Sequence, residues 1–279
     1  MAEPSEFWSS TDFPYTCLRD RSRTATLAAV VSATVRPGDV VLDAGAGTGI
    51  LALYAARAGA RRVHAVETDP VLCRYLRRTV ERNGYADVIE VVEADVHGFE
   101  APTVDVALVE LIETALVDEA LVSAYNALLG TGTVGPATRC LPASYTTVAQ
   151  PVLTDDRYDG FEVVALRHDW PHYERDPETW GTWTATPAGP AVEVWHGDFA
   201  GEPVDPVVHL RVPVPPGTAV NGLRLTGELG MPDGTRCTEF PSLNGPKIVP
   251  LTPRPAGAEA VEVRYTMSAG FRGFQPRWV

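Results

Sequence analysis

A glycine-rich loop lies between two predicted strands, with an acid on either side of it. The first apolar strand ends in Asp43, and the second, some twenty residues later, ends at Glu67. The glycines of the loop are Gly45, Gly47 and Gly49. Glycine lets the backbone approach a ligand closely, and an acid at the end of the second strand can accept hydrogen bonds from both hydroxyls of a ribose. The pattern predicts a nucleoside-binding site in a doubly wound sheet.

The spacing of the glycines indicates which nucleoside binds. A dinucleotide site usually reads G-x-G-x-x-G and places a pyrophosphate on a helix N-terminus. Here the run is D-A-G-A-G-T-G, and Asp43 would repel a pyrophosphate but could anchor a cationic group. The run followed by Glu67 resembles the first two motifs of class I methyltransferases, which implies S-adenosylmethionine as the cofactor. A nicotinamide dinucleotide site is the alternative.

Strand and helix patterns alternate over the first half of the chain, which predicts a parallel sheet. From Pro142 onward, short β-branched runs alternate with Pro and Gly turns, which predicts an antiparallel barrel or sandwich. Residues 155–185 are rich in Asp, Trp, Tyr, His and Pro and look like an inserted segment.

Several acids follow the fourth predicted strand, which ends at Val109. Two of them are Glu110 and, nine positions later, Glu119. Ligands of an open parallel sheet bind beyond the carboxyl ends of its strands, so Glu110 should face the site. A guanidinium ion is planar, charged at neutral pH and presents its N–H groups as a fixed fork, which two carboxylates can hold. The pair predicts methyl transfer to a guanidinium by in-line displacement.

The assignment of the second acid has alternatives. Asp118 and Glu119 lie at a predicted helix start, where the helix dipole favours acids that have no function. Glu113 lies close to them and could be the second acid instead.

These residues resemble the protein arginine methyltransferase family, which carries two glutamates nine positions apart after its fourth strand. The run LRDRSRT, residues 18–24, looks like the family's helix whose arginine binds the cofactor carboxylate, and that arginine maps to Arg23. The resemblance is dense over residues 13–130. It implies a Rossmann-like class I methyltransferase domain followed by a β-barrel-like domain with an inserted arm. The expected divisions are an N-terminal helical segment closing the cofactor site (1–35), the cofactor domain (36–141) and the β-rich substrate domain (142–279).

The chain departs from the family where a peptide substrate would bind. The family's paired tyrosines are not recognisable near the N-terminus, where Trp8, Phe13 or Tyr15 could take their place. The family's Thr-His-Trp loop should fall at residues 239–247, which lack histidine and tryptophan. Asn244 could line the acceptor pocket there, although an Asn-Gly pair is more typical of a β-turn without that function. The departures favour free arginine or a small guanidine as substrate, in a biosynthetic pathway, with peptidyl arginine as the alternative.

Further cofactor contacts are expected after the third strand. Asp95 stands where class I methyltransferases often place an acid or amide against the adenine amino group, Val96 could offer its backbone N–H to the ring, and His97 takes the position of a family glutamate. A polar loop without function is the alternative.

Composition bounds the remaining possibilities. A net charge of −13 argues against a nucleic-acid partner, and no apolar run reaches the length of a membrane span. The N-terminus lacks an apolar signal segment, and the four cysteines lack metal-ligand spacing, so a cytoplasmic protein without a metal is expected. The family's arm implies a homodimer, with the aromatic residues of 170–183 as candidate contacts and with core packing under a loop as the alternative role for them. A non-catalytic regulator of the same fold is disfavoured because the cofactor acids and Glu110 are present.

Overall fold

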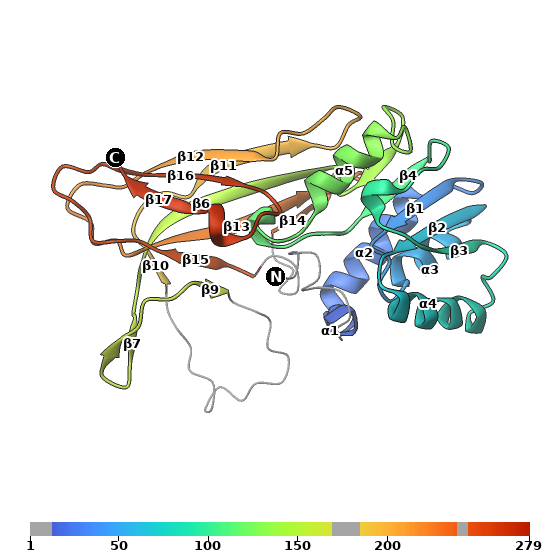
Figure 1. Cartoon of the computed structure of the whole chain (residues 1–279), viewed down its shortest axis with the longest axis horizontal. Helices are drawn as coiled ribbons and strands as arrows, with labels where there is room; N and C mark the ends of the chain where they lie inside the picture. The colour runs from blue at the N-terminus through green and yellow to red at the C-terminus, as the bar shows by residue number, and fades with distance from the viewer. Residues whose placement is uncertain (1–12, 169–184, 239–244) are drawn as a thin grey trace.

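The computed structural model describes residues 13–168, 185–238 and 245–279. Figure 1 shows a parallel sheet with its helices at one end of the long axis and the antiparallel strands at the other. One buried apolar cluster contains side chains of both parts, from Leu27 near the N-terminus to Phe274 near the C-terminus. None of the described helices is long and apolar enough to cross a membrane.

The N-terminal part is a five-stranded parallel sheet in the order β3-β2-β1-β4-β5. The strands are β1 (Val40–Ala44), β2 (Arg62–Glu67), β3 (Ile89–Glu93), β4 (Val106–Val109) and β5 (Arg139–Leu141). The strand order reverses between β1 and β4, and a crevice opens beyond the carboxyl ends of strands at such a point. The predicted Rossmann-like sheet is confirmed.

Helices connect these strands and precede them. They are α1 (Phe13–Arg19), α2 (Arg21–Thr34), α3 (Ile50–Arg57), α4 (Pro70–Arg82) and α5 (Leu121–Gly130), with short 3-10 turns η2 (Val96–Gly98) and η3 (Thr114–Leu116). Acids fix two of the starts, since Asp20 accepts a hydrogen bond from Arg23 N and Asp69 caps α4. The helix expected from Glu119 begins at Leu121, so Glu119 lies on the loop before the helix.

The C-terminal part consists of antiparallel sheets. In the larger one, the long central strand β6 pairs with β13, β11 and β10, and β13 continues to β15 and β9, while β12, β16 and β17 form a second sheet. The strands are β6 (Ser144–Thr154), β9 (Arg167–His168), β10 (Ala185–Pro187), β11 (Val192–Asp198), β12 (Val207–Pro213), β13 (Gly222–Gly230), β14 (Arg236–Cys237), β15 (Lys247–Pro250), β16 (Ala260–Thr266) and β17 (Gln275–Trp278), with η4 (Phe271–Gly273) before β17. The predicted order, a parallel sheet followed by an antiparallel β domain, is confirmed, whereas closure into a barrel and the domain divisions stay predictions.

A hairpin stands away from the antiparallel sheets (Figure 1). It is formed by β7 (Arg157–Tyr158) and β8 (Phe161–Glu162). Its side chains expose apolar surface, with Phe161 72% and Tyr158 47% accessible, and Val164, just after β8, is 64% accessible. The hairpin lies within the segment expected to be an inserted arm. The aromatic residues expected at 170–183 lie outside the described residues.

Candidate functional site

A cavity of about 520 Å³ lies beyond the carboxyl ends of the parallel strands, at the point where the strand order reverses. The residues predicted for the site that line it are Arg23, Asp43, Gly45, Gly47, Glu67, Asp95, Val96, His97, Glu110 and Glu119. Gly49, Glu113 and Tyr15 are not among the lining residues, and Asn244 lies outside the described residues. Tyr15, on α1, is 64% exposed.

Asp43 is buried at the end of β1, directly before the glycine loop. Its Oδ2 accepts a hydrogen bond of 2.9 Å from the backbone N–H of Ala52, in the helix that follows the loop. Burial, together with the nearby carboxylates of Glu110 and Glu67, raises the pKa of Asp43 to about 7, although the hydrogen bond from Ala52 N opposes this rise. A cationic ligand would favour its ionised form.

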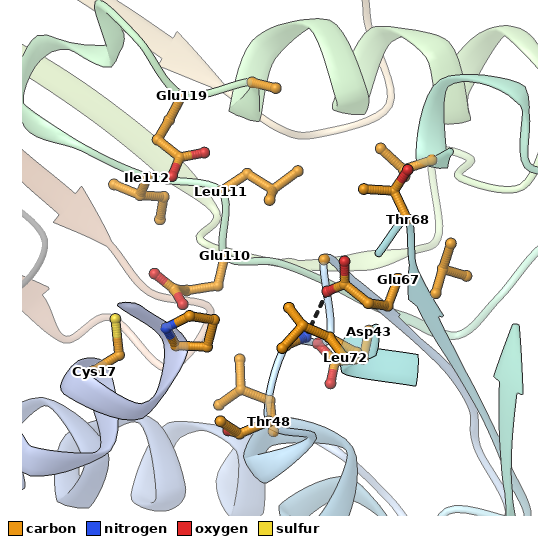
Figure 2. Close-up of a pocket in the computed structure, with 18 of the residues that line it drawn as sticks. Cys17, Asp43, Thr48, Glu67, Thr68, Leu72, Glu110, Leu111, Ile112 and Glu119 are labelled. Carbon is orange, nitrogen blue, oxygen red and sulfur yellow. Dashed lines mark hydrogen bonds between the residues drawn. The ribbon is translucent and has the colours of Figure 1, made fainter. Parts of the chain in front are cut away.

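Glu67, at the end of β2, is held by backbone donors on both oxygens. Oε2 accepts from Gly47 N at 2.9 Å (Figure 2). Oε1 accepts from Asp69 N, also at 2.9 Å. An ionised carboxylate offers about four acceptor positions, so these two bonds orient the group and leave capacity for two hydroxyls.

The three glycines of the loop all have positive φ, which an L side chain rarely adopts. A Cβ on Gly45 would come within 2.5 Å of Leu111 Cδ2, so the loop passes close to the segment that follows β4. Gly49 is the left-handed residue at the start of α3, and a Cβ there would collide with Leu76. Gly45 and Gly47 therefore shape the cavity, and Gly49 shapes the turn into the helix.

The segment after β3 forms one wall of the cavity through Asp95, Val96 and His97. The carboxylate of Asp95 accepts from His97 N at 2.9 Å, and this hydrogen bond lowers the pKa of Asp95. Nδ1 of His97 lies 2.8 Å from the same carboxylate, and Nε2 lies 3.0 Å from Ser123 Oγ. The side chain of Asp95 is 69% exposed and thus free to accept from a ligand.

Arg23 is a buried cation on α2, 3% exposed. It forms an ion pair with Glu110, and its backbone N–H is held by Asp20. Its Nε is buried and has no hydrogen-bond partner in the described structure. The sequence predicts a contact with the cofactor carboxylate. The structure places Arg23 where it reaches both the cofactor side of the cavity and the first of the two acids.

Glu110 and Glu119 share the cavity. Glu110 follows β4, Glu119 precedes α5, and Figure 2 shows their carboxylates directed into the same space. Burial raises the pKa of Glu110, an effect that Arg23 opposes. Burial, followed by the charges of Glu110 and Glu113, raises the pKa of Glu119 to about 8. Among the described residues, no arginine or lysine forms an ion pair with Glu119.

The loop between the two acids is fixed by the antiparallel domain. Ala115 and Leu116 have positive φ, 63° and 52°, which is unfavourable for residues with a Cβ. The hydroxyl of Tyr145 accepts from Ala115 N at 2.9 Å, and Tyr265 donates to Ala115 O at 2.8 Å. Ser268 donates from its hydroxyl to Glu119 O at 2.7 Å. These contacts hold the unfavourable backbone in place.

Glu113 lies behind the cavity. It forms an ion pair with Lys247, and its Oε1 accepts from Asp118 N at 2.7 Å. Of the two candidates for the second acid, the structure therefore brings Glu119 into the cavity with Glu110. The sequence does not single out Tyr145, Tyr265 and Lys247, because nothing in their local pattern links them to a loop that lies elsewhere in the chain.

The sheet order, the glycine loop after β1 and the acid after β2 together define a class I methyltransferase fold joined to an antiparallel β domain. The model of the TRM5/TYW2 methyltransferase domain family matches residues 21–126, under half of the chain.

Similar proteins match part of the sequence. The chain is 33% identical over 139 residues to the uncharacterized protein MJ1452 of Methanocaldococcus jannaschii, covering 50% of this chain and 53% of that protein. It is 34% identical over 113 residues to an arginine N(omega)-methyltransferase of Streptomyces achromogenes, covering 38% of this chain and 31% of that protein. The chain thus spans about half or less of the curated relatives that it matches.

The whole fold has counterparts among solved structures. The PRMT1 enzyme–prozyme complex of Trypanosoma brucei, solved with AdoHcy, superposes with a TM-score of 0.67 at 18% identity, covering 89% of this chain and 85% of that chain. The arrangement of a parallel sheet followed by antiparallel sheets is therefore that of the protein arginine methyltransferases.

Proposed function

We propose that the protein is an S-adenosylmethionine-dependent N-methyltransferase that acts on a guanidinium nitrogen of free arginine or a small guanidine in a biosynthetic pathway. The observation that carries the proposal is the carboxylate of Glu119. It lies in the same cavity as Glu110 and the nucleoside-binding acid Glu67, and no cation of the described chain neutralises it. A bound guanidinium supplies a positive charge and thereby favours the ionised form of Glu119.

The cofactor residues suit a ligand with a ribose, positive charge and no phosphate. Glu67 keeps acceptor capacity for the ribose hydroxyls, and Asp43 favours a cation. Arg23 offers its unpartnered Nε to the cofactor carboxylate, and Asp95 and the Val96 backbone are placed for the adenine. S-adenosylmethionine supplies an activated methyl group on a sulfonium.

Glu110 and Glu119 hold the acceptor. A guanidinium held by two carboxylates has its N–H donors fixed and its charge drawn away from one nitrogen, which becomes more nucleophilic. A bond forms between this nitrogen and the methyl carbon while the carbon–sulfur bond breaks, and the nitrogen then loses a proton to a carboxylate or to water. The chain contributes position and electrostatics and forms no covalent intermediate.

Two observations support different acceptors. The Streptomyces relative is named for arginine rather than for a protein, which supports free arginine. Peptidyl arginine is the second candidate because the fold matches a structure named protein arginine methyltransferase 10, from Arabidopsis thaliana.

Mass spectrometry of the products decides between these acceptors. The protein is incubated with S-adenosylmethionine and free arginine, agmatine or an Arg-Gly-rich peptide, with Glu119→Gln as the matched control. We expect methylated free arginine or agmatine with the wild type and not with the variant. Methylation of the peptide alone selects the second candidate, and methylation of none of them overturns the proposal.

We further propose a homodimer that uses the β7–β8 hairpin, because its exposed Tyr158 and Phe161 suit burial against a second copy. All four cysteines are free thiols, which supports a reducing, cytoplasmic location.

A further inference from the structure

Lys247 is the only lysine in a chain that contains 23 lysines and arginines together. It is the first residue of β15 and is 2% exposed. A lysine is rarely buried to this degree unless its charge is paired, because desolvating an ammonium is costly. Its surroundings therefore indicate what this single lysine does.

Two acids from the loop between Glu110 and Glu119 surround the ammonium. Lys247 Nζ forms an ion pair with Glu113 and lies 3.0 Å from Asp118 Oδ2. The ring of Phe271 lies 5.2 Å from the same nitrogen, within cation–π distance. A compact ammonium with three donors suits two carboxylates that approach from different directions better than a planar guanidinium does.

The contacts of Lys247 are connected to Glu119 through the residues that precede it in the chain. Glu113 is bonded both to Lys247 and to Asp118 N, so the loop is closed upon itself around the ammonium. Asp118 is adjacent to Glu119, and both line the cavity. The backbone between Glu113 and Asp118 includes the two positive-φ residues, so local preference alone would not keep this shape.

We infer that Lys247 is a positioning residue for acceptor binding, which draws Glu113 and Asp118 together and thereby fixes Glu119 opposite Glu110. The inference rests on the proposed function for its kinetic consequence, but the geometry of the loop can be tested without turnover. Without Lys247, the 3% exposed Glu113 loses its counter-ion and Asp118 loses its anchor.

The kinetic experiment compares three variants with the wild type. Lys247→Met removes the ammonium, Lys247→Met/Glu113→Gln removes the ammonium together with the acid it neutralises, and Arg277→Met removes an exposed cation of the same domain. We expect kcat/KM for the acceptor to fall about a hundredfold in both Lys247 variants, while the Kd of the cofactor stays within about threefold. The double variant should recover the Tm lost in the single variant, and Arg277→Met should resemble the wild type. The inference is overturned if the double variant also recovers kcat/KM, since Lys247 would then serve only to satisfy Glu113.

A second experiment needs no turnover. Growth with [13C]lysine labels one side chain in the whole chain, so the NMR spectrum reports Lys247 alone. With S-adenosylhomocysteine bound, free arginine should shift its Cε signal. Hydrogen exchange of residues 113–119 should be faster in Lys247→Met than in the wild type, with exchange in β1 and β4 unchanged. A Lys247 signal unmoved at saturating arginine, or an unchanged exchange rate of the loop, contradicts the inference. Absent turnover with a faster-exchanging loop contradicts only the proposed function.

Discussion

The acids proposed to bind the cofactor and the acids proposed to bind the acceptor are held in place by different means. Glu67 is oriented by backbone N–H groups within 20 residues of it, and Asp43 by the N–H of Ala52, nine residues away. The loop that carries Glu119 is instead held by Tyr265 and Ser268, about 150 residues further along the chain. Local sequence thus builds the cofactor side of the cavity, whereas the antiparallel domain builds the acceptor side.

The largest expected effects are those of variants on the proposed cofactor side and the proposed acceptor side of the cavity, which should change different constants. Glu110→Gln keeps an oxygen for Arg23 but removes the charge that faces the acceptor, so kcat should fall at least about a hundredfold with little change in the Kd of the cofactor. Glu67→Gln should instead raise the Kd of the cofactor about tenfold and leave kcat at saturating cofactor nearly unchanged.

Calorimetry with S-adenosylhomocysteine and steady-state kinetics measure these two effects. Glu90→Gln, at an exposed acid on β3, is the control. If both variants changed the same constant, the division into a cofactor side and an acceptor side would be wrong.

A change of pH should have a smaller effect on kcat/KM for the acceptor. Because the pKa of Glu119 is raised to about 8, its protonated form prevails near neutrality, whereas the guanidinium requires the carboxylate. At saturating cofactor, kcat/KM for the acceptor should therefore rise as pH increases through about 8, and Glu119→Gln should lower the activity and remove that rise.

As pH rises, ionisation of Glu119 should increase activity but decrease the stability of the folded chain. Between the ordinary pKa of a glutamate and about 8, the folded chain binds a proton that the unfolded chain releases, so this group's contribution to stability falls as pH rises. Glu119→Gln should therefore raise Tm more at about pH 9 than at about pH 5. A Tm difference between variant and wild type that does not depend on pH would contradict the raised pKa.

The smallest effect is expected from a variant that weakens the attachment of the antiparallel domain to the loop between Glu110 and Glu119. Tyr265→Phe removes one buried hydrogen bond, to Ala115 O, and should raise KM for the acceptor severalfold while leaving the Kd of the cofactor unchanged, because a single such bond contributes about 1 kcal/mol. Tyr85→Phe, in the loop before β3, serves as the control. A change in the cofactor Kd would show that the loop also shapes the cofactor side.

The sequence predicts most of the cofactor half. The strands from β1 to β4 and the helices between them follow from apolar runs, capping acids and terminal glycines, which act over a few residues. The three-residue strand β5 was not predicted, because it is too short to show a pattern. Helix α5 begins two residues later than the sequence predicts, because the acids before it are typical of a helix's first turn.

The acceptor side could be predicted only in part. The spacing of Glu110 and Glu119 shows in the sequence, but the choice between Glu113 and Glu119 depends on Lys247, which is brought near only by the fold of the second half. The positive φ of Ala115 and Leu116 cannot be predicted from their residue types, because neither is glycine, asparagine or aspartate.

The attachment of one loop to a distant domain has a consequence for engineering. A hybrid gene that fuses residues 1–141 to the second half of a relative would keep an intact nucleoside pocket. It would nevertheless lose Tyr145, Tyr265, Ser268 and Lys247 unless the donor happened to carry equivalents. Changing the proposed acceptor would thus require exchanging the loop and its distant anchors as one unit.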